Sequence, residues 1–234
     1  MRAAIAVVVT ASMLLGASEA AADEPLFEYG PSDADSIQVD SGAYPGNKNA
    51  LYWWDHPNLT VEVRAAPNVD VTKLQAVHDA IQIWSQILEA RLPEISLTDV
   101  THLKRSENPD IILHYVPHSG GYIFGGLAVC GAQKCLNVIV RSDQPPGGPY
   151  TDWDTVRITR SAVHEIGHAL GLGHAAPLLT SRDIMGYGWA IPDPDPDLVP
   201  ILSDCALDGI RAAFSWLYAG EAPHPSPVAT VACS

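Results

Sequence analysis

Basic residues are scarce in this chain of 234 residues, which has 13 Lys and Arg against 27 Asp and Glu and a net charge of −14. Binding to nucleic-acid phosphates or to an anionic membrane surface needs clustered Lys and Arg. The composition therefore excludes these two classes of partner. We attribute the acidity to solubility rather than to a cationic substrate.

Apolar runs of membrane-spanning length are absent after residue 22. At the start of the chain, Arg2 precedes an apolar segment at residues 3–15, and three alanines end at Ala22. This order is typical of a secretory signal peptide at residues 1–22, and its apolar segment falls short of the about 20 residues that span a bilayer. An uncleaved anchor is the alternative. We expect a secreted monomer with no membrane partner after signal cleavage.

The chain has only four cysteines, an even number that suggests disulfides in an oxidising compartment. Cys130 and Cys135 flank a short loop between two apolar segments, which favours a local disulfide. Cys205 and Cys233 would then connect the C-terminal tail to the last helix. A zinc site made of cysteines is the alternative, although the paired Cys-x-x-Cys spacing of such sites is missing.

Internal repeats are also missing, and the length allows one domain of about 170 to 200 residues. Residues 23–49 are rich in Pro, Gly, Ser and Asp, which indicates an N-terminal arm or a short pro-segment. Residues 50–220 form the predicted folded domain. Residues 221–234 are a Pro-rich tail.

Hydrophobic periodicity predicts an α+β domain. The long helix shows the pattern best, because Val77, Ile81, Trp84 and Leu88 recur at helical spacing after the N-cap candidate Asp70. The closing helix should begin at Ser203 and carry Leu207, Ile210, Phe214 and Leu217 on one face. The expected elements are strands at 59–64, 109–116, 126–130 and 136–141 and helices at 70–91, 155–170 and from 203 onward.

One segment concentrates the chemistry, and its sequence is His164-Glu-Ile-Gly-His-Ala-Leu-Gly-Leu-Gly-His174. Residues four apart lie on one face of a helix, so His164 and His168 can direct two imidazoles at one metal ion. Glu165 is placed beside that ion rather than on it. Gly171 suits a helix end, after which the chain can turn back and bring His174 to the same ion. Three neutral imidazoles leave the fourth position of a tetrahedral Zn²⁺ open to water, as in catalytic zinc sites.

This segment resembles the metzincin zinc metallopeptidases, whose pattern is H-E-x-x-H-x-x-G-x-x-H followed by a turn that contains methionine. The sequence Asp183-Ile-Met-Gly-Tyr187 supplies such a turn. The resemblance implies one catalytic Zn²⁺ on the three histidines, an apolar floor formed by Met185, and Glu165 as general base and acid in peptide-bond hydrolysis.

The resemblance also implies a fold and a way of binding substrate. Metzincins have a twisted, mostly parallel sheet with an antiparallel edge strand, a long packing helix, an active-site helix and a C-terminal helix. By this resemblance, residues 126–130 form the edge strand beside the cleft. A protein or peptide substrate would bind there as a further extended strand.

Subfamily features are mixed. The layout from Tyr52 to Asp143 resembles matrixins, whereas Tyr187 stands where astacin-like and serralysin-like members have a tyrosine and matrixins usually have proline. That tyrosine can approach the zinc or the oxyanion, so Tyr187 is a candidate catalytic residue; a packed or surface tyrosine is the alternative. Ala175 follows the third histidine, where matrixins usually have serine.

Further ion sites and latency are weaker hypotheses. His114 and His118 flank a strand end and could join a second, structural zinc site. The acidic segment 191–197 could bind Ca²⁺, but its alternating prolines do not make the carboxylates converge, so a solvated loop is favoured. Residues 23–49 contain no cysteine, which excludes a thiolate cap on the zinc. Asp33 or Asp35 could take that part, or the arm is simply solvated.

The main hypothesis is therefore a secreted zinc endopeptidase. One rival is a secreted, non-catalytic binding protein on the same scaffold, which would have no chemical need for Glu165. A second rival is a zinc amidase that acts on a non-peptide amide with the same residues.

Overall fold

The computed structural model describes residues 26–39, 53–103, 108–117, 126–130, 135–143, 154–187 and 198–234. The predicted signal peptide, His118 and the acidic segment 191–197 lie outside these residues. None of the helices in the described ranges has the length and apolarity that a membrane span requires.

The central sheet has five strands in the order β4-β3-β5-β7-β6, of which only the edge strand β6 runs antiparallel to its neighbour. The prediction of a mixed α+β domain with a mostly parallel sheet is confirmed. The short strand β4 was not predicted. The bounds of the strands are β3 Asn58–Ala65, β4 Ser96–Asp99, β5 Ile111–Val116, β6 Gly126–Cys130 and β7 Cys135–Arg141.

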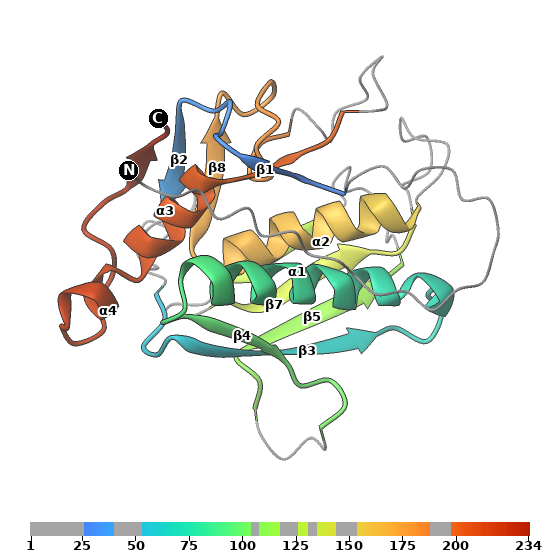
Figure 1. Cartoon of the computed structure of the whole chain (residues 1–234). Helices are drawn as coiled ribbons and strands as arrows, with labels where there is room; N and C mark the ends of the chain where they lie inside the picture. Colours follow the sequence, from blue (N-terminus) through green and yellow to red (C-terminus); the bar gives the residue numbers. More distant parts are fainter. Residues whose placement is uncertain are drawn as a thin grey trace.

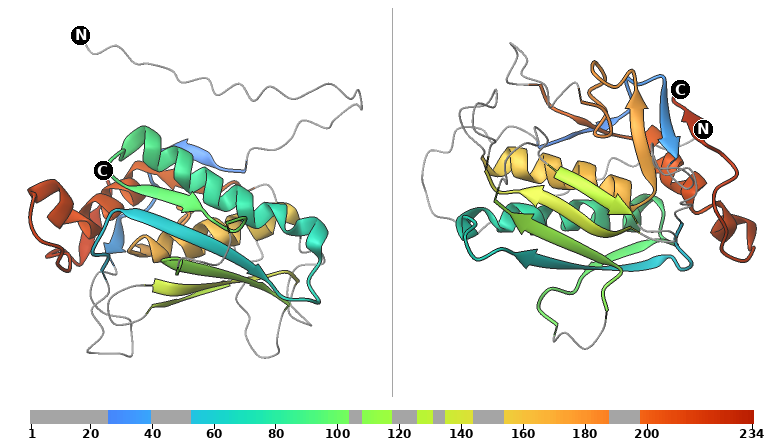
Figure 2. Two further views of the ribbon diagram at one scale, coloured as in Figure 1. Left: turned by 90° about the horizontal axis from the view of Figure 1, so that it is seen from below. Right: turned by 180° about the vertical axis from the view of Figure 1, so that it is seen from behind.

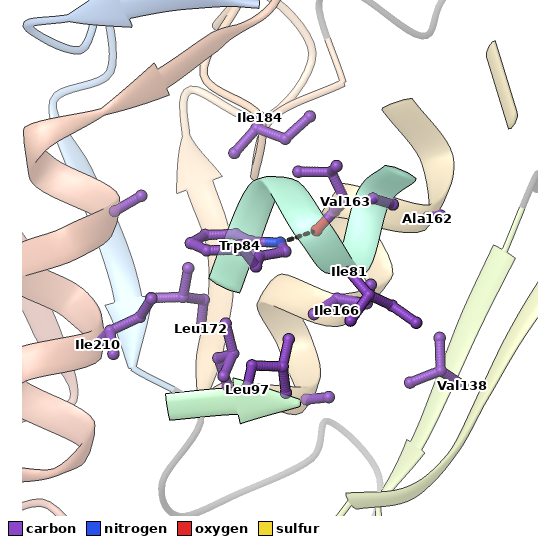
Figure 3. Packing of buried hydrophobic residues seen from close by; sticks show 14 of the residues in the cluster. Ile81, Trp84, Leu97, Val138, Ala162, Val163, Ile166, Leu172, Ile184 and Ile210 are labelled. Atoms are coloured by element: carbon purple, nitrogen blue, oxygen red, sulfur yellow. Dashed lines mark hydrogen bonds between the residues drawn. The ribbon is translucent and has the colours of Figure 1, made fainter. Parts of the chain in front are cut away.

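Two helices, α1 (Gln75–Arg91) and α2 (Thr155–Ala169), lie side by side on one face of this sheet (Figure 1). The long helix starts slightly later than predicted, because Asp70 caps a short 3₁₀ turn, Val71–Lys73, before α1 begins. Trp84 of α1 is fully buried, and its Nε1–H donates to the carbonyl of Val163 in α2 over 2.8 Å (Figure 3). This bond satisfies the one polar atom of a large side chain in the centre of the core.

Of the remaining strands, three gather with α3 at one end of these two layers (Figure 2), and β1 runs along α2 (Figure 1). The remaining strands form a three-stranded sheet, β10-β2-β8, and a parallel pair, β1-β9. The described part of the N-terminal arm thus pairs with strands of the domain, and the end of the Pro-rich tail pairs with β2 of that arm. The bounds are β1 Glu28–Gly30, β2 Ser36–Val39, β8 Leu172–Ala176, β9 Ile201–Ser203 and β10 Thr230–Ala232.

The predicted disulfide between Cys205 and Cys233 is confirmed. It joins α3 to the chain just after β10, so the tail is covalently fixed to the domain. The pairing of β6 with β7 sets Cys130 opposite Cys135 along the backbone. Their side chains are not among those described, so the second disulfide stays a prediction.

The sequence predicts one continuous closing helix, which is wrong. Helix α3 (Asp204–Ala213) is capped by Phe214, and a separate short helix, α4 (Ser215–Ala219), follows. The predicted cap is correct, since the hydroxyl of Ser203 accepts the N–H of Ala206 over 3.0 Å. Phe214 and Trp216 are both buried, with 1% and 6% of their surfaces exposed. Residues two apart point to nearly opposite sides of a straight helix, and the break at Phe214 accompanies the burial of both side chains.

Candidate active site

Helix α2 places two imidazoles on one face, one turn apart. Its N-terminus is capped by Asp154, whose carboxylate accepts the N–H of Arg157 over 2.8 Å. The Nε2 atoms of His164 and His168 lie 3.2 Å apart. Two neutral nitrogen acceptors at this distance repel each other unless a proton or a cation lies between them.

The third imidazole arrives because the helix ends where the sequence predicts. Gly171 has φ +99°, a left-handed conformation, and a Cβ there would meet the Cβ of Ala213 at 2.7 Å. The chain then reverses into β8, which carries His174. Candidate ligand atoms of the three histidines all lie within 4.8 Å of one another. Within the described residues, this is the group of His, Cys, Asp and Glu side chains that could hold a metal ion.

Backbone carbonyls orient two of the rings. Nδ1 of His164 lies 2.6 Å from the carbonyl oxygen of Ile184, and Nδ1 of His168 lies 2.8 Å from that of Leu172. A carbonyl only accepts, so both Nδ1 atoms carry the proton and both Nε2 atoms keep a free lone pair. The rings therefore present their lone pairs toward each other, as metal-ligating histidines do.

The rings are also held neutral. Burial lowers the pKa of His164 well below its usual value and lowers the pKa of His168 to about 4. Burial lowers the pKa of His174 as well. Neutral imidazole is the form that binds a metal.

This donor set fits a tetrahedral divalent metal ion. Nitrogen ligands at about 2.0–2.1 Å from such an ion are about 3.3 Å from each other, close to the Nε2 separation of His164 and His168. Imidazole donors suit zinc, copper, iron and nickel. The three histidines could therefore hold a transition-metal ion, and their geometry does not select one metal.

Glu165 lies against the edge strand β6. Its side chain is 8% exposed and accepts the backbone N–H of Ala128. Burial raises the pKa of Glu165 to about 8, and the hydrogen bond from Ala128 offsets part of that rise. A Cβ on Gly126 would lie 2.4 Å from Cγ of Glu165, so this side chain occupies the space that a larger residue would fill.

The turn around Met185 lies behind the helix. Met185 is fully buried, and its Sδ packs against Gly167, where a Cβ would lie only 2.5 Å away. Asp183 stabilises the turn by accepting the N–H of Met185 over 3.0 Å. The carbonyl of Met185 accepts the N–H of Ala175, which directly follows the third histidine in β8.

Tyr187 lies next to His174, the histidine on β8. Its hydroxyl lies 2.9 Å from Nε2 of His174, so the two side chains share a hydrogen bond. The centroid of its ring lies 4.9 Å from that of His174 and 5.4 Å from that of His164. The structure thus brings together His164, His168, His174 and Tyr187, four of the five residues that the sequence proposes. The fifth, Glu165, follows His164 on α2, and its side chain contacts β6.

Other residues considered in the sequence have different partners. Nε2 of His114, on β5, bonds with the side-chain oxygen of Asn137 over 2.8 Å. The carboxylate of Asp33 bonds with the Met-turn segment rather than with the histidines. No second zinc cluster is found within the described ranges, and His118 lies outside them.

Three supporting residues were not found from the sequence. Ala128 donates its backbone N–H to Glu165, and Gly126 makes room for that side chain because it has no Cβ. Neither feature produces a recognisable sequence pattern. Asp183 could have been recognised, since an aspartate side chain often accepts the backbone N–H two residues further on, here that of Met185. A comparison with models of known protein families finds no match.

Proposed function

We propose that the protein is a secreted zinc endopeptidase with a metzincin-like active site. The observation that carries this proposal is the convergence of three neutral imidazoles, with the buried carboxylate of Glu165 next to His164 on α2 and bonded to the edge strand β6. Zinc is proposed because three imidazoles with one open position are the donor set of catalytic zinc sites. The disulfide between Cys205 and Cys233 supports an oxidising, extracellular compartment.

Each residue has a role in peptide hydrolysis. Bound Zn²⁺ would lower the pKa of a water molecule toward about 7 and polarise the scissile carbonyl. Glu165 would take the proton of the attacking water and deliver it to the leaving amine. The raised pKa of Glu165 suits the second step, because its carboxyl group can hold a proton near neutral pH. Tyr187 would donate a hydrogen bond to the developing oxyanion.

The edge strand gives the substrate a place to bind. Strand β6 ends the central sheet, and Gly126 and Ala128 of this strand contact Glu165. An extended peptide that pairs with β6 would have its backbone next to that carboxylate. Main-chain pairing of this kind accepts many sequences, which is consistent with an endopeptidase.

The rivals make different demands on Glu165. A binding scaffold has no need for a buried carboxylate, and burial of this group is costly, as its raised pKa indicates. We therefore favour an enzyme. An amidase that acts on a non-peptide amide would use the same atoms, so the substrate must be tested directly.

The test is cleavage of a randomised peptide library, followed by mass spectrometry. The zinc-loaded protein should cut internal peptide bonds, and a chelator or Glu165→Gln should abolish cleavage. Glu89→Gln on α1, where the side chain is exposed, is the matched control and should keep full activity. A zinc-loaded wild-type protein that cuts none of the peptides would overturn the proposal.

A further inference from the structure

Residues 26–39 bond with the turn around Met185 and pair with β8, both next to the proposed metal site. We propose that they are a permanent part of this site rather than a removable pro-segment. Within them, Asp33 is a positioning residue: it fixes the turn around Met185 and, through Ile184, the direction of His164. This inference rests on the proposed function only in assuming that a metal ion binds the three histidines.

The carboxylate of Asp33 accepts hydrogen bonds from three successive residues of the turn. Its Oδ1 accepts from the hydroxyl of Ser181 over 2.7 Å and from the N–H of Asp183 over 3.2 Å. Both oxygens accept the N–H of Arg182, at 3.0 and 2.9 Å. An ionised acceptor makes such bonds shorter and stronger than a neutral one. Asp33 therefore holds residues 181–183 in one conformation.

A second contact from the same segment reaches the buried Asp183. This residue is fully buried, and its Oδ2 accepts the hydroxyls of Ser32 over 2.6 Å and Ser203 over 2.5 Å. Its Oδ1 accepts the N–H of Met185. A buried carboxylate is stable only when donors surround it, so the hydroxyl of Ser32 helps to keep Asp183 in place.

Ile184, the next residue, connects this network to the metal ligand. Its N–H donates to the carbonyl of Ile201 over 2.7 Å, and its own carbonyl accepts Nδ1–H of His164 over 2.6 Å. The position of this carbonyl sets the direction in which Nε2 of His164 points. Partners that orient a metal-ligating histidine in this way influence metal affinity.

Strand β2 of the same segment supports the other two ligands. It pairs with β8, with Ile37 opposite Ala175 and Val39 opposite Leu172. Ala175 follows His174, and the carbonyl of Leu172 orients His168. Residues 26–39 thus contact the backbone on which all three ligands depend, and their side chains at positions 27, 37 and 39 belong to the core.

The first experiment measures zinc affinity, by competition with a chromogenic chelator, in the otherwise intact protein. Asp33→Asn should weaken zinc binding about tenfold, the lower end of the effect of outer-shell partners. Asp35→Asn is the matched control, because Asp35 is an exposed aspartate on the same segment, and it should bind zinc like wild type. The visible spectrum of the Co²⁺-substituted protein should change in Asp33→Asn only.

A purely structural role of Asp33 would lower the melting temperature and leave zinc affinity and the Co²⁺ spectrum at wild-type values; that result would overturn the proposal. If Asp33→Asn does not fold, Ser32→Ala replaces it, since Asp183 then keeps two of its three donors. Weaker zinc binding by Ser32→Ala supports the proposal, and wild-type affinity contradicts it. Neither readout uses peptide cleavage, so the endopeptidase proposal can fail while this one stands.

Maturation gives an independent test. N-terminal sequencing of the secreted, zinc-containing protein should find a first residue at or before Leu26. A stable form that contains one zinc ion and begins after Val39 would show that the segment is removable, and the proposal would be wrong.

Discussion

The hydroxyl of Tyr187 lies 2.9 Å from Nε2 of His174, one of the two ring nitrogens with which this histidine could bind a metal. A proton donated to this nitrogen and a metal ion compete for the same lone pair. We therefore expect a metal ion bound at this nitrogen to displace the hydroxyl of Tyr187 from it, so that the hydroxyl can donate to a reacting carbonyl.

Tyr187→Phe should have two opposite effects. Zinc affinity should rise about fivefold, because a hydrogen bond worth about 1 kcal/mol no longer has to be broken. The kcat for peptide cleavage should fall about a hundredfold, as when one oxyanion donor is removed. Chelator competition measures the first effect and steady-state kinetics the second. An unchanged kcat would show that Tyr187 only packs against the histidines.

Glu165 should make the stability of the metal-free protein depend on pH. The unfolded chain ionises this residue near its usual pKa of 4.5, whereas the folded protein keeps the proton up to about pH 8. The folded state thus binds more protons in this range, so the free energy of unfolding falls as pH rises from 4.5 to 8. Each pKa unit corresponds to about 1.4 kcal/mol.

Glu165→Gln removes this titration. In the presence of a chelator, urea unfolding should find the variant increasingly more stable than wild type between pH 4.5 and 8. The histidines titrate in the opposite direction, since their lowered pKa values favour folding as pH rises, but they are common to both proteins. A stability difference that does not vary with pH would contradict the burial of an ionisable Glu165.

Gly126→Ala should displace the carboxylate of Glu165 without disturbing the histidines. The new Cβ would lie 2.4 Å from Cγ of Glu165, so the side chain must move away from Ala128. We expect kcat to fall at least about tenfold, because small misplacements of a catalytic group are costly. Gly30→Ala is the control, since a Cβ there meets nothing within 4 Å. Zinc titration and steady-state kinetics of both variants test this prediction. Loss of zinc binding in Gly126→Ala would contradict it, because the histidines should stay in place.

The disulfide between Cys205 and Cys233 closes a loop of 28 residues. A cross-link of this length restricts the unfolded chain and should contribute about 3–4 kcal/mol to stability. Replacing both cysteines by alanine should lower the free energy of unfolding by that amount in urea titrations. A loss of less than about 1 kcal/mol would mean that the tail is held mainly by the pairing of β10 with β2.

The sequence predicts the parts of the site that are local in the chain. His164, Glu165 and His168 follow from helical spacing, and Gly171 marks the end of the helix because of its conformational freedom. The strands β3, β5, β6 and β7 follow from alternation and apolar runs. These features depend on neighbours within a few residues, so a single sequence is enough to recognise them.

What the sequence does not predict depends on distant pairing. Ser32 bonds with Asp183, which lies 151 residues away in the sequence, and no periodic pattern predicts such a contact. The pairing of residues 26–39 with β8 and β9 is of the same kind. The break at Phe214 was missed because the apolar spacing from Leu207 to Leu217 continues through it.

The most direct test of the account is X-ray absorption at the zinc edge of the purified protein. The account predicts one zinc ion per chain, with three imidazole nitrogens and one oxygen at about 2.0–2.1 Å. A His168→Ala variant should lose that signal. A protein that binds no zinc, or zinc bound through sulfur, would contradict the central claim.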